Sequence, residues 1–271
     1  MSLTNYFHIT GNTEEQKNLL RHNKPQKLEG ICAEINFFEK LVKPSFNLYS
    51  TGWWFKLQGE GYKVIKLNVN GVESLSSLDH YVLNHFYKQH VPCFVAEFSF
   101  SEAAFFWGQF LGQDLAAFKE AWKNTRRFHP PKRTVTRAEK AGSKKEEAIN
   151  YLETRGYLPA VAVERLFADY HLGSNLWDLD CISWYDGALI GFEMKQKYPI
   201  RAGTFGLNKG LIKLFNYLNQ KGIRIIHTIL TKPVWNEHFS AIRLYAEEPY
   251  KSLSLWIAAE YSKDKFKGGT R

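Results

Sequence analysis

The stretch Trp177–Lys197, WDLDCISWYDGALIGFEMKQK, constrains the fold more than any other part of the chain. Asp186-Gly187 lies between two runs rich in apolar residues. This dipeptide is the strongest short-range signal for a β-hairpin, because a type I′ turn needs positive φ at both central residues. The stretch therefore predicts two strands, Leu176–Trp184 and Ala188–Lys197, joined by a two-residue turn.

Counting outward from the turn predicts the register of this hairpin. Asp180 then faces Glu193, and Asp178 faces Lys195. Because side chains alternate along a strand, these residues share one face, and the other face is nearly all apolar, with Leu179, Cys181, Ser183, Ile190, Phe192 and Met194.

The acidic face of the hairpin predicts a bound cation. Like charges directly opposite each other destabilise a sheet, so a cation is expected between Asp180 and Glu193. Mg²⁺ takes oxygen ligands of this kind, and Gly191 on the same face leaves room for a close approach. The alternative is a solvent-facing edge on which Asp178 and Lys195 form an ordinary ion pair.

Length and composition bound the class of protein. The chain has 271 residues, enough for one large domain or two small ones. No apolar run approaches the roughly 18 residues of a membrane span, and the N-terminus lacks the apolar stretch of a signal peptide. Cys32, Cys93 and Cys181 lie far apart and are odd in number, which indicates neither a disulfide framework nor a zinc site. We expect a reducing, cytoplasmic setting without membrane attachment.

Positive charge is concentrated in one segment. The formal net charge is +9, and residues 123–145 hold nine basic residues against one acid. Such a segment attracts phosphate backbones, although a solvated linker is the alternative. His129-Pro130-Pro131 interrupts any helix there. We therefore predict a domain over 1–123, a basic linker over 124–142 and a second domain over 143–271.

The predicted elements indicate an α/β (α+β) fold. In the first domain we expect helices and strands in mixed order, as a unit for DNA recognition or partner binding: helices Leu28–Val42, Ser76–His90 and Glu102–Lys123, and strands Phe46–Gln58, Tyr62–Asn68 and Pro92–Phe100. In the second domain we expect a helix, three strands, a helix and a strand: Ser143–Arg155, Val161–Ala168, the two hairpin strands, Gly206–Lys221 and Ile223–Leu230.

This αβββαβ order, with Asp180 in the second strand and Glu193-Met194-Lys195 in the third, resembles the PD-(D/E)xK superfamily of restriction-endonuclease-like nucleases. The resemblance covers residues 143–230. The proline of the motif is missing, with Leu179 in its place, as it is in many members of the family.

The resemblance implies a Mg²⁺ site, in which Mn²⁺ can substitute, and hydrolysis of DNA phosphodiester bonds. Asp180, Glu193 and the backbone carbonyl of Met194 would hold the metal, which acidifies a bound water. Lys195 would position that water and stabilise charge on the phosphate. The family often adds an acid from the first helix, for which Glu146 fits best; Glu147 and Glu164 are the alternatives.

The expected partner is DNA, cut by an endonuclease of a restriction, repair or mobile-element system. A homodimer or partner proteins of such a system are also expected. The alternative is a non-catalytic nucleic-acid-binding or assembly protein that retains the fold. The residues expected to contact nucleic acid are Arg126, Arg127, Lys132, Arg133, Arg137, Gln196, Lys197, Arg201 and Lys209.

Overall fold

The fold is described from a computed structural model for residues 11–69, 71–122, 126–128, 143–171, 175–197, 206–231 and 256–262. The chain divides into two compact units, each made of two separate segments. Unit 1 comprises residues 1–28 and 56–176, and unit 2 comprises residues 29–55 and 177–271. The predicted domains 1–123 and 143–271 do not coincide with these units. Both units combine helices with a mixed sheet, so the protein belongs to the α+β class.

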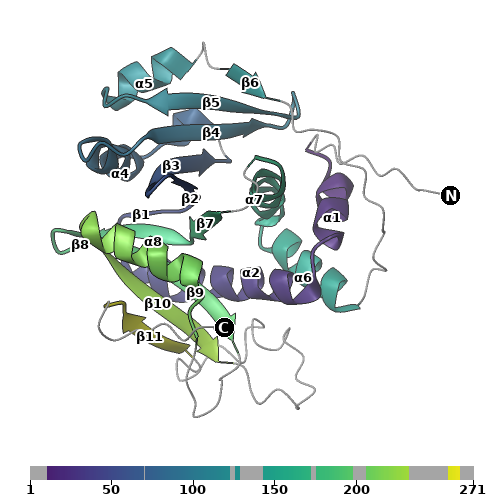
Figure 1. The fold of residues 1–271 in the computed structure, drawn as a ribbon. Helices are drawn as coiled ribbons and strands as arrows, with labels where there is room; N and C mark the ends of the chain where they lie inside the picture. Colours follow the sequence, from purple (N-terminus) through teal and green to yellow (C-terminus); the bar gives the residue numbers. More distant parts are fainter. Residues whose placement is uncertain are drawn as a thin grey trace. The chain divides into compact units, whose positions relative to one another are not determined.

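The sheet of unit 1 has the strand order β6-β5-β4-β3-β2-β7 (Figure 1). In the sequence, the division between the units falls within β2 and within β7. Its strands are β2 (Trp53–Gln58), β3 (Gly61–Asn68), β4 (Cys93–Ser99), β5 (Ala104–Phe110), β6 (Arg126–Phe128) and β7 (Leu176–Leu179). Its helices are α1 (Thr13–Arg21), η2 (Val72–Ser74), α4 (Ser77–Tyr87), α5 (Leu115–Trp122), α6 (Ser143–Thr154) and α7 (Leu158–His171).

Several elements of unit 1 were predicted, and two predictions were wrong. Helix α4 begins after Ser76, which forms a capping box with Asp79. The helix predicted over 102–123 is instead strand β5 followed by α5, and Gly112 has a φ of 79° between them. The strand predicted over 161–168 lies inside α7. A short apolar run is compatible with a buried helix as well as with a buried strand, and residues 161–168 are helical in the structure.

Unit 2 contains a five-stranded sheet with the order β1-β8-β9-β10-β11 (Figure 1). The strands are β1 (Tyr49–Ser50), β8 (Cys181–Tyr185), β9 (Ala188–Lys197), β10 (Ile223–Thr231) and β11 (Trp256–Glu260). The helices are α2 (Pro25–Phe37), which continues into the π-helix η1 (Phe38–Val42) and α3 (Lys43–Ser45), and α8 (Lys209–Gln220). Strands β9 and β10 are parallel, and the other neighbours are antiparallel.

The αβββαβ order predicted over residues 143–230 is wrong. Its first helix, α6, and the segment predicted as its first strand, which is part of α7, belong to unit 1. In unit 2, α2 and β1 precede the insertion of residues 56–176, and β8, β9, α8 and β10 follow it. These six elements are a helix, three strands, a helix and a strand, and they come from two segments of the chain.

The register of the hairpin is confirmed from Cys181 to Tyr185, whereas the predicted pairing of Asp178 with Lys195 is wrong, because β7 pairs in the other sheet. Asp186 and Gly187 have φ values of 48° and 76°, and Tyr185 pairs with Ala188. The predicted apolar face is buried against the segment Phe37–Val42, with Cys181, Ile190, Phe192 and Met194 in one core cluster. Helix α8 packs against β10 in front of the sheet in Figure 1. Its apolar side chains at helical spacing are buried: Leu211, Leu214, Phe215 and Leu218.

The strand predicted over 176–184 is interrupted at Asp180. Residues before it form β7 in the other sheet, and residues after it form β8. The alternation of side chains between the two faces of the sheet is broken at Asp180. Leu179 therefore does not lie on the same face as Met194, as was expected. Instead it lies over Gly191, where an added Cβ would meet Leu179 Cδ2 at 2.7 Å. The opening predicted at Gly191 is therefore filled by an apolar side chain.

Candidate functional site

Three carboxylates from three elements of unit 2 meet at one ammonium group. Lys195 Nζ lies 3.0 Å from Glu193 Oε1, 3.3 Å from Glu34 Oε1 and 3.8 Å from Asp180 Oδ2. Glu193 and Lys195 come from β9, Asp180 from the residue before β8, and Glu34 from α2. We call these four residues the Lys195 cluster. It contains the predicted Asp180, Glu193 and Lys195, and one acid that the sequence did not indicate.

The position of Asp180 follows from the break between β7 and β8. Its N–H donates to the carbonyl of Phe192 at 3.1 Å, which continues the ladder of the hairpin by one bond. Its Oδ2 accepts a hydrogen bond from the N–H of Met194 at 2.5 Å. The carboxylate thus satisfies a backbone donor of β9 that a carbonyl of a continuing strand would otherwise accept from. The side chain is thereby held against β9, close to Lys195.

Glu34 reaches the cluster because α2 packs against the hairpin. Phe37, one helical turn further along α2, lies in the core cluster with Phe192 and Met194. Glu34 and Lys195 are 161 positions apart in the sequence. Sequence reasoning missed Glu34, and the available signal was weak, since Glu34 is one of two glutamates in a mostly apolar helix.

The cluster carries more negative than positive charge. The carboxylate of Asp178 also acts electrostatically on Glu34, Asp180, Glu193 and Lys195. The side chain of Glu193 is fully buried, and among the described residues the Lys195 ammonium is the one cation in ion-pair contact with its carboxylate. Such burial is costly for an ionised group. Among the described residues, the ion pair of Asp178 with Lys195 that the alternative interpretation required is not formed, because residues 176–179 pair in the other sheet as β7.

The pKa values of these acids are displaced upward. Burial, and then the neighbouring carboxylates, raise the pKa of Glu34 to about 8 and that of Asp180 to about 6, although Lys195 acts in the opposite direction. The pKa of Glu193 is raised well above its ordinary value for the same reasons. Burial alone would lower the pKa of Lys195, but the surrounding carboxylates raise it. The acids are thus poised to hold protons when no further cation is present.

A buried histidine lies beside the cluster. His227 on β10 is the register partner of Glu193, and its Nδ1 lies 3.0 Å from the Glu193 carbonyl oxygen. Among the described residues its Nε2 has no hydrogen-bond partner, and burial lowers the pKa of the ring to about 4. The ring also contacts Phe215 of α8. The sequence did not single out this residue, because a histidine in an apolar strand is a common core residue.

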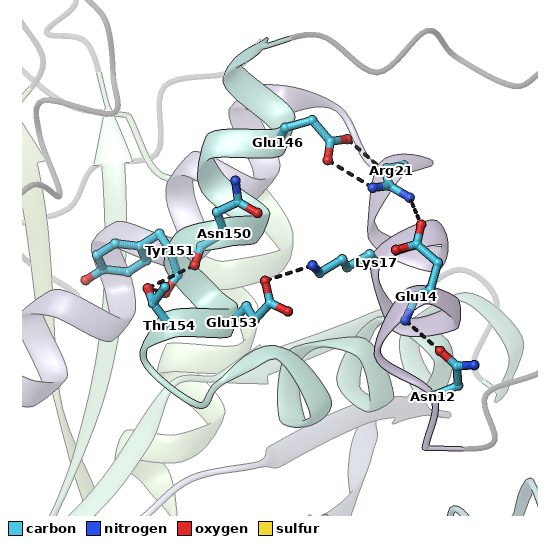
Figure 2. A network of polar contacts seen from close by, with 9 residues as sticks. All are labelled: Asn12, Glu14, Lys17, Arg21, Glu146, Asn150, Tyr151, Glu153 and Thr154. Atoms are coloured by element: carbon cyan, nitrogen blue, oxygen red, sulfur yellow. Dashed lines mark hydrogen bonds and ion pairs between the residues drawn. The ribbon is translucent and has the colours of Figure 1, made fainter.

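Glu146, the predicted helix-borne ligand, is engaged elsewhere. It lies on α6 in unit 1, and its two carboxylate oxygens accept hydrogen bonds from Arg21 of α1 at 2.8 and 3.0 Å (Figure 2). Of the two alternatives, Glu147 is exposed on α6 and Glu164 lies on α7, a helix of unit 1. The helix-borne carboxylate that meets Lys195 in unit 2 is therefore Glu34, and not the predicted Glu146.

The residues expected to contact nucleic acid are only partly described. The backbone of Arg126 and Arg127 forms strand β6, so the predicted linker 124–142 contains a strand at its start. Gln196 and Lys197 end β9, where Lys197 Nζ donates to the carbonyl of Gly206 at 2.7 Å. Lys209 is exposed at the start of α8. The other four of these residues lie outside the described residues: Lys132, Arg133, Arg137 and Arg201.

A metal ion would have to displace the ammonium of Lys195. Within the described part of the chain, no three His, Cys, Asp or Glu side chains close around a common point as metal ligands do. Lys195 Nζ lies among the carboxylates instead, and its side chain is 26% exposed. The chemistry of the ligand atoms fits a hard cation, because the acids offer only oxygen atoms and outnumber the one ammonium among them.

Comparisons with known proteins returned no relatives: no family model, no curated protein and no solved structure matches this chain. Among the helices of the described ranges, none has the length and apolar character that crossing a bilayer requires.

Proposed function

We propose that unit 2 is a Mg²⁺-dependent nuclease that hydrolyses phosphodiester bonds of DNA and belongs to the PD-(D/E)xK group. The αβββαβ order of unit 2 supports this proposal, as does the position of the chemistry-bearing residues within it. Asp180 precedes the second strand, Glu193 and Lys195 lie on the third, and Glu34 adds the acid from the first helix. The proposal places the enzyme in the cytoplasm, with DNA as its partner.

The observation that carries the proposal is the excess of carboxylates around Lys195. A network that serves only stability gains little from buried acids that outnumber their cations, because removing charges from water is expensive. Among the described residues, Lys195 is the one cation in ion-pair contact with the buried Glu193, and the same ammonium also faces Glu34, Asp180 and the field of Asp178. A divalent cation would balance this charge, which explains why the sequence retains so many acids at one point.

The residues of the Lys195 cluster would have two roles, metal binding and contact with the reacting groups. Asp180, Glu193 and Glu34 would hold the ion, together with the carbonyl of Met194. When bound, the ion lowers the pKa of a water ligand and offsets charge on the phosphate. Lys195, released from the carboxylates, would donate hydrogen bonds to the attacking water or the scissile phosphate.

Cleavage assays test the proposal. Supercoiled plasmid and end-labelled DNA and RNA oligonucleotides are incubated with Mg²⁺, with Mn²⁺ and with EDTA. We expect metal-dependent cleavage of DNA that is lost in Asp180→Asn, Glu193→Gln and Lys195→Ala. Glu60→Gln, which changes an exposed acid in the turn between β2 and β3, is the matched control and should keep full activity.

Metal binding gives a second readout that does not depend on finding the right substrate. Calorimetric titration with Mn²⁺ should show binding to the wild type and to Glu60→Gln, and none to Glu193→Gln. Absence of both binding and cleavage would overturn the proposal. Salt-dependent DNA binding that Asp180→Asn leaves unchanged, without cleavage, would then favour the non-catalytic alternative.

A further inference from the structure

Unit 1 carries a strip of polar and aromatic side chains across one face of its sheet. The strip consists of Lys56 on β2, Lys63 on β3, Phe94 on β4 and Gln109 on β5. The two-residue turn after Gln58 sets Lys56 opposite Lys63, and Phe94 pairs with Gln109. All four side chains remain at least partly accessible to solvent.

The remainder of this face is core. Ile65, Ala96, Phe98 and Phe105 share it by register and are buried. Phe167 of α7 contacts Phe105 and stacks on the neighbouring Trp107. Helix α7 thus packs on the Phe105 and Trp107 part of this face, whereas the strip is the part that remains accessible to solvent.

Positive charge on the strip is uncompensated. Within the described residues no carboxylate lies within ion-pair distance of Lys56 or Lys63. Like charges directly opposite each other destabilise a sheet. Burial and the neighbouring Lys56 lower the pKa of Lys63. Two lysines that repel each other, with no carboxylate of the described residues within ion-pair distance, are suited to bind an anion.

The aromatic ring beside them adds a second kind of contact. Lys63 Nζ lies 5.6 Å from the centroid of the Phe94 ring, above its face. A cation held by a ring at an accessible site is held weakly. A phosphate can therefore draw the ammonium away and leave the ring face to a base.

We propose that this strip binds an unpaired nucleic-acid strand, with phosphates at Lys56 and Lys63 and a base stacked on Phe94. Proteins that bind single strands combine basic grooves with aromatic platforms in this way, whereas the bases of a duplex are stacked on each other and cannot reach the ring. The inference rests on the proposed function only in taking nucleic acid as the ligand. An acidic protein segment would use the lysines but not the flat ring.

Fluorescence anisotropy with a labelled oligothymidylate, in EDTA and over a range of NaCl concentrations, tests the proposal. Lys56→Ala/Lys63→Ala should weaken binding about tenfold and reduce the slope of log affinity against log salt by about 1.4, the value for two phosphate contacts on a single strand. Phe94→Ala should weaken binding about tenfold through the lost stacking, while Phe94→Trp should retain it. Binding to a duplex of equal length should be unaffected by Phe94→Ala.

The matched control is Lys24→Ala/Lys88→Ala, which removes two exposed lysines from the same unit without touching the strip. It should change the salt slope much less than the strip variant. Equal effects of the two double variants, or wild-type binding by a correctly folded Phe94→Ala, would overturn the proposal. Competition by polyglutamate that is lost in the strip variant but not in Phe94→Ala would assign the surface to an acidic protein. Because EDTA prevents metal-dependent cleavage, the outcome does not depend on whether unit 2 is a nuclease.

Discussion

Lys195 shows how much one residue can contribute to holding the acids of unit 2 together. It contacts three carboxylates, and one of them, Glu193, is completely buried. Removing one partner of a buried ion pair leaves the other charge without compensation, which is far more costly than never forming the pair. The stability of the metal-free protein should therefore depend on this side chain.

We expect Lys195→Met to lower the free energy of unfolding by about 3 kcal/mol in EDTA, because the buried carboxylates lose their counter-ion. Mg²⁺ should restore much of this loss, since a bound ion stabilises the folded state. Urea denaturation with EDTA and with Mg²⁺ measures both effects. Lys88→Met, at an exposed lysine, serves as the control and should behave like the wild type. Equal stability of all three proteins would contradict this account of the cluster.

The pH dependence of stability provides a second test at Glu34. Its pKa rises from 4.5 to about 8 on folding, so between these values the folded state binds a proton that the unfolded state has released. The free energy of unfolding should then fall as pH rises from 6.5 to 8.5. Urea denaturation in EDTA at several pH values measures this slope. Glu34→Gln should flatten the dependence, and a slope of the opposite sign would show that the acid is ionised in the metal-free protein.

At the level of elements, the break between β7 and β8 sets the geometry of the site. It turns Asp180 into the plane of the sheet, and it moves Leu179 over Gly191 of β9. Gly191 is needed here because of a close approach and not because of its backbone conformation, since its φ is not positive.

Gly191→Ala should cost about 1–3 kcal/mol of stability, because the new methyl group would lie 2.7 Å from Leu179 Cδ2 and 2.8 Å from Ile225 Cδ1. Leu179→Ala in the same chain should recover part of this loss by making room. A double-mutant cycle measured by thermal or urea unfolding gives the coupling between the two sites. Strictly additive costs would mean that Leu179 does not fill the space over Gly191.

In unit 1, helices α1 and α6 are joined by ion pairs. Arg21 binds both Glu146 and Glu14, and Lys17 binds Glu153 (Figure 2). The bidentate geometry of Arg21 with Glu146 makes this pair stronger than an ordinary surface pair. Glu146 thereby has a structural role that accounts for its conspicuous position on the helix.

Glu146→Gln should lower stability by about 1 kcal/mol through the loss of the bidentate pair. Calorimetric Mn²⁺ binding should be unchanged, because the acid is not part of the Lys195 cluster. Glu14→Gln, whose side chain is 61% exposed, is the matched control and should cost less. Loss of Mn²⁺ binding in Glu146→Gln would reinstate this residue as a ligand.

For the whole molecule, the distribution of charge matters more than its sum. The net charge of +9 is concentrated in residues 123–145, and phosphate contacts made by that segment would release counter-ions on binding. Long-range attraction of DNA therefore depends on this segment, whereas the proposed chemistry depends on an acidic point in unit 2.

Replacing Lys132, Arg133 and Arg137 together by Gln should reduce the salt slope of duplex DNA binding by about 2 to 3, if each side chain neutralises one phosphate. Affinity measured at several NaCl concentrations gives this slope. Replacing Lys24, Lys27 and Lys88 by Gln removes the same charge from exposed positions elsewhere and is the control. Identical slopes for the two triple variants would show that only net charge matters.

Local patterns in the sequence were sufficient for the hairpin and for α8. The dipeptide Asp186-Gly187 favours a two-residue turn, and that turn sets the register of the strands beside it. The apolar residues of α8 recur at helical spacing, so the helix can be recognised without knowing what it packs against. Asp180, Glu193 and Lys195 could be grouped for this reason, since all three lie within the reach of one turn.

Only the tertiary structure could add Glu34 and reassign Glu146. The first helix and first strand of unit 2 precede an insertion of 121 residues, over residues 56–176, and nothing in the local pattern marks which helix will pack on the hairpin. The same holds for Leu179, whose face depends on β7 pairing in the other sheet. Hydrophobic periodicity reports which side of an element is buried, but the partner that buries it is chosen by packing across the whole chain.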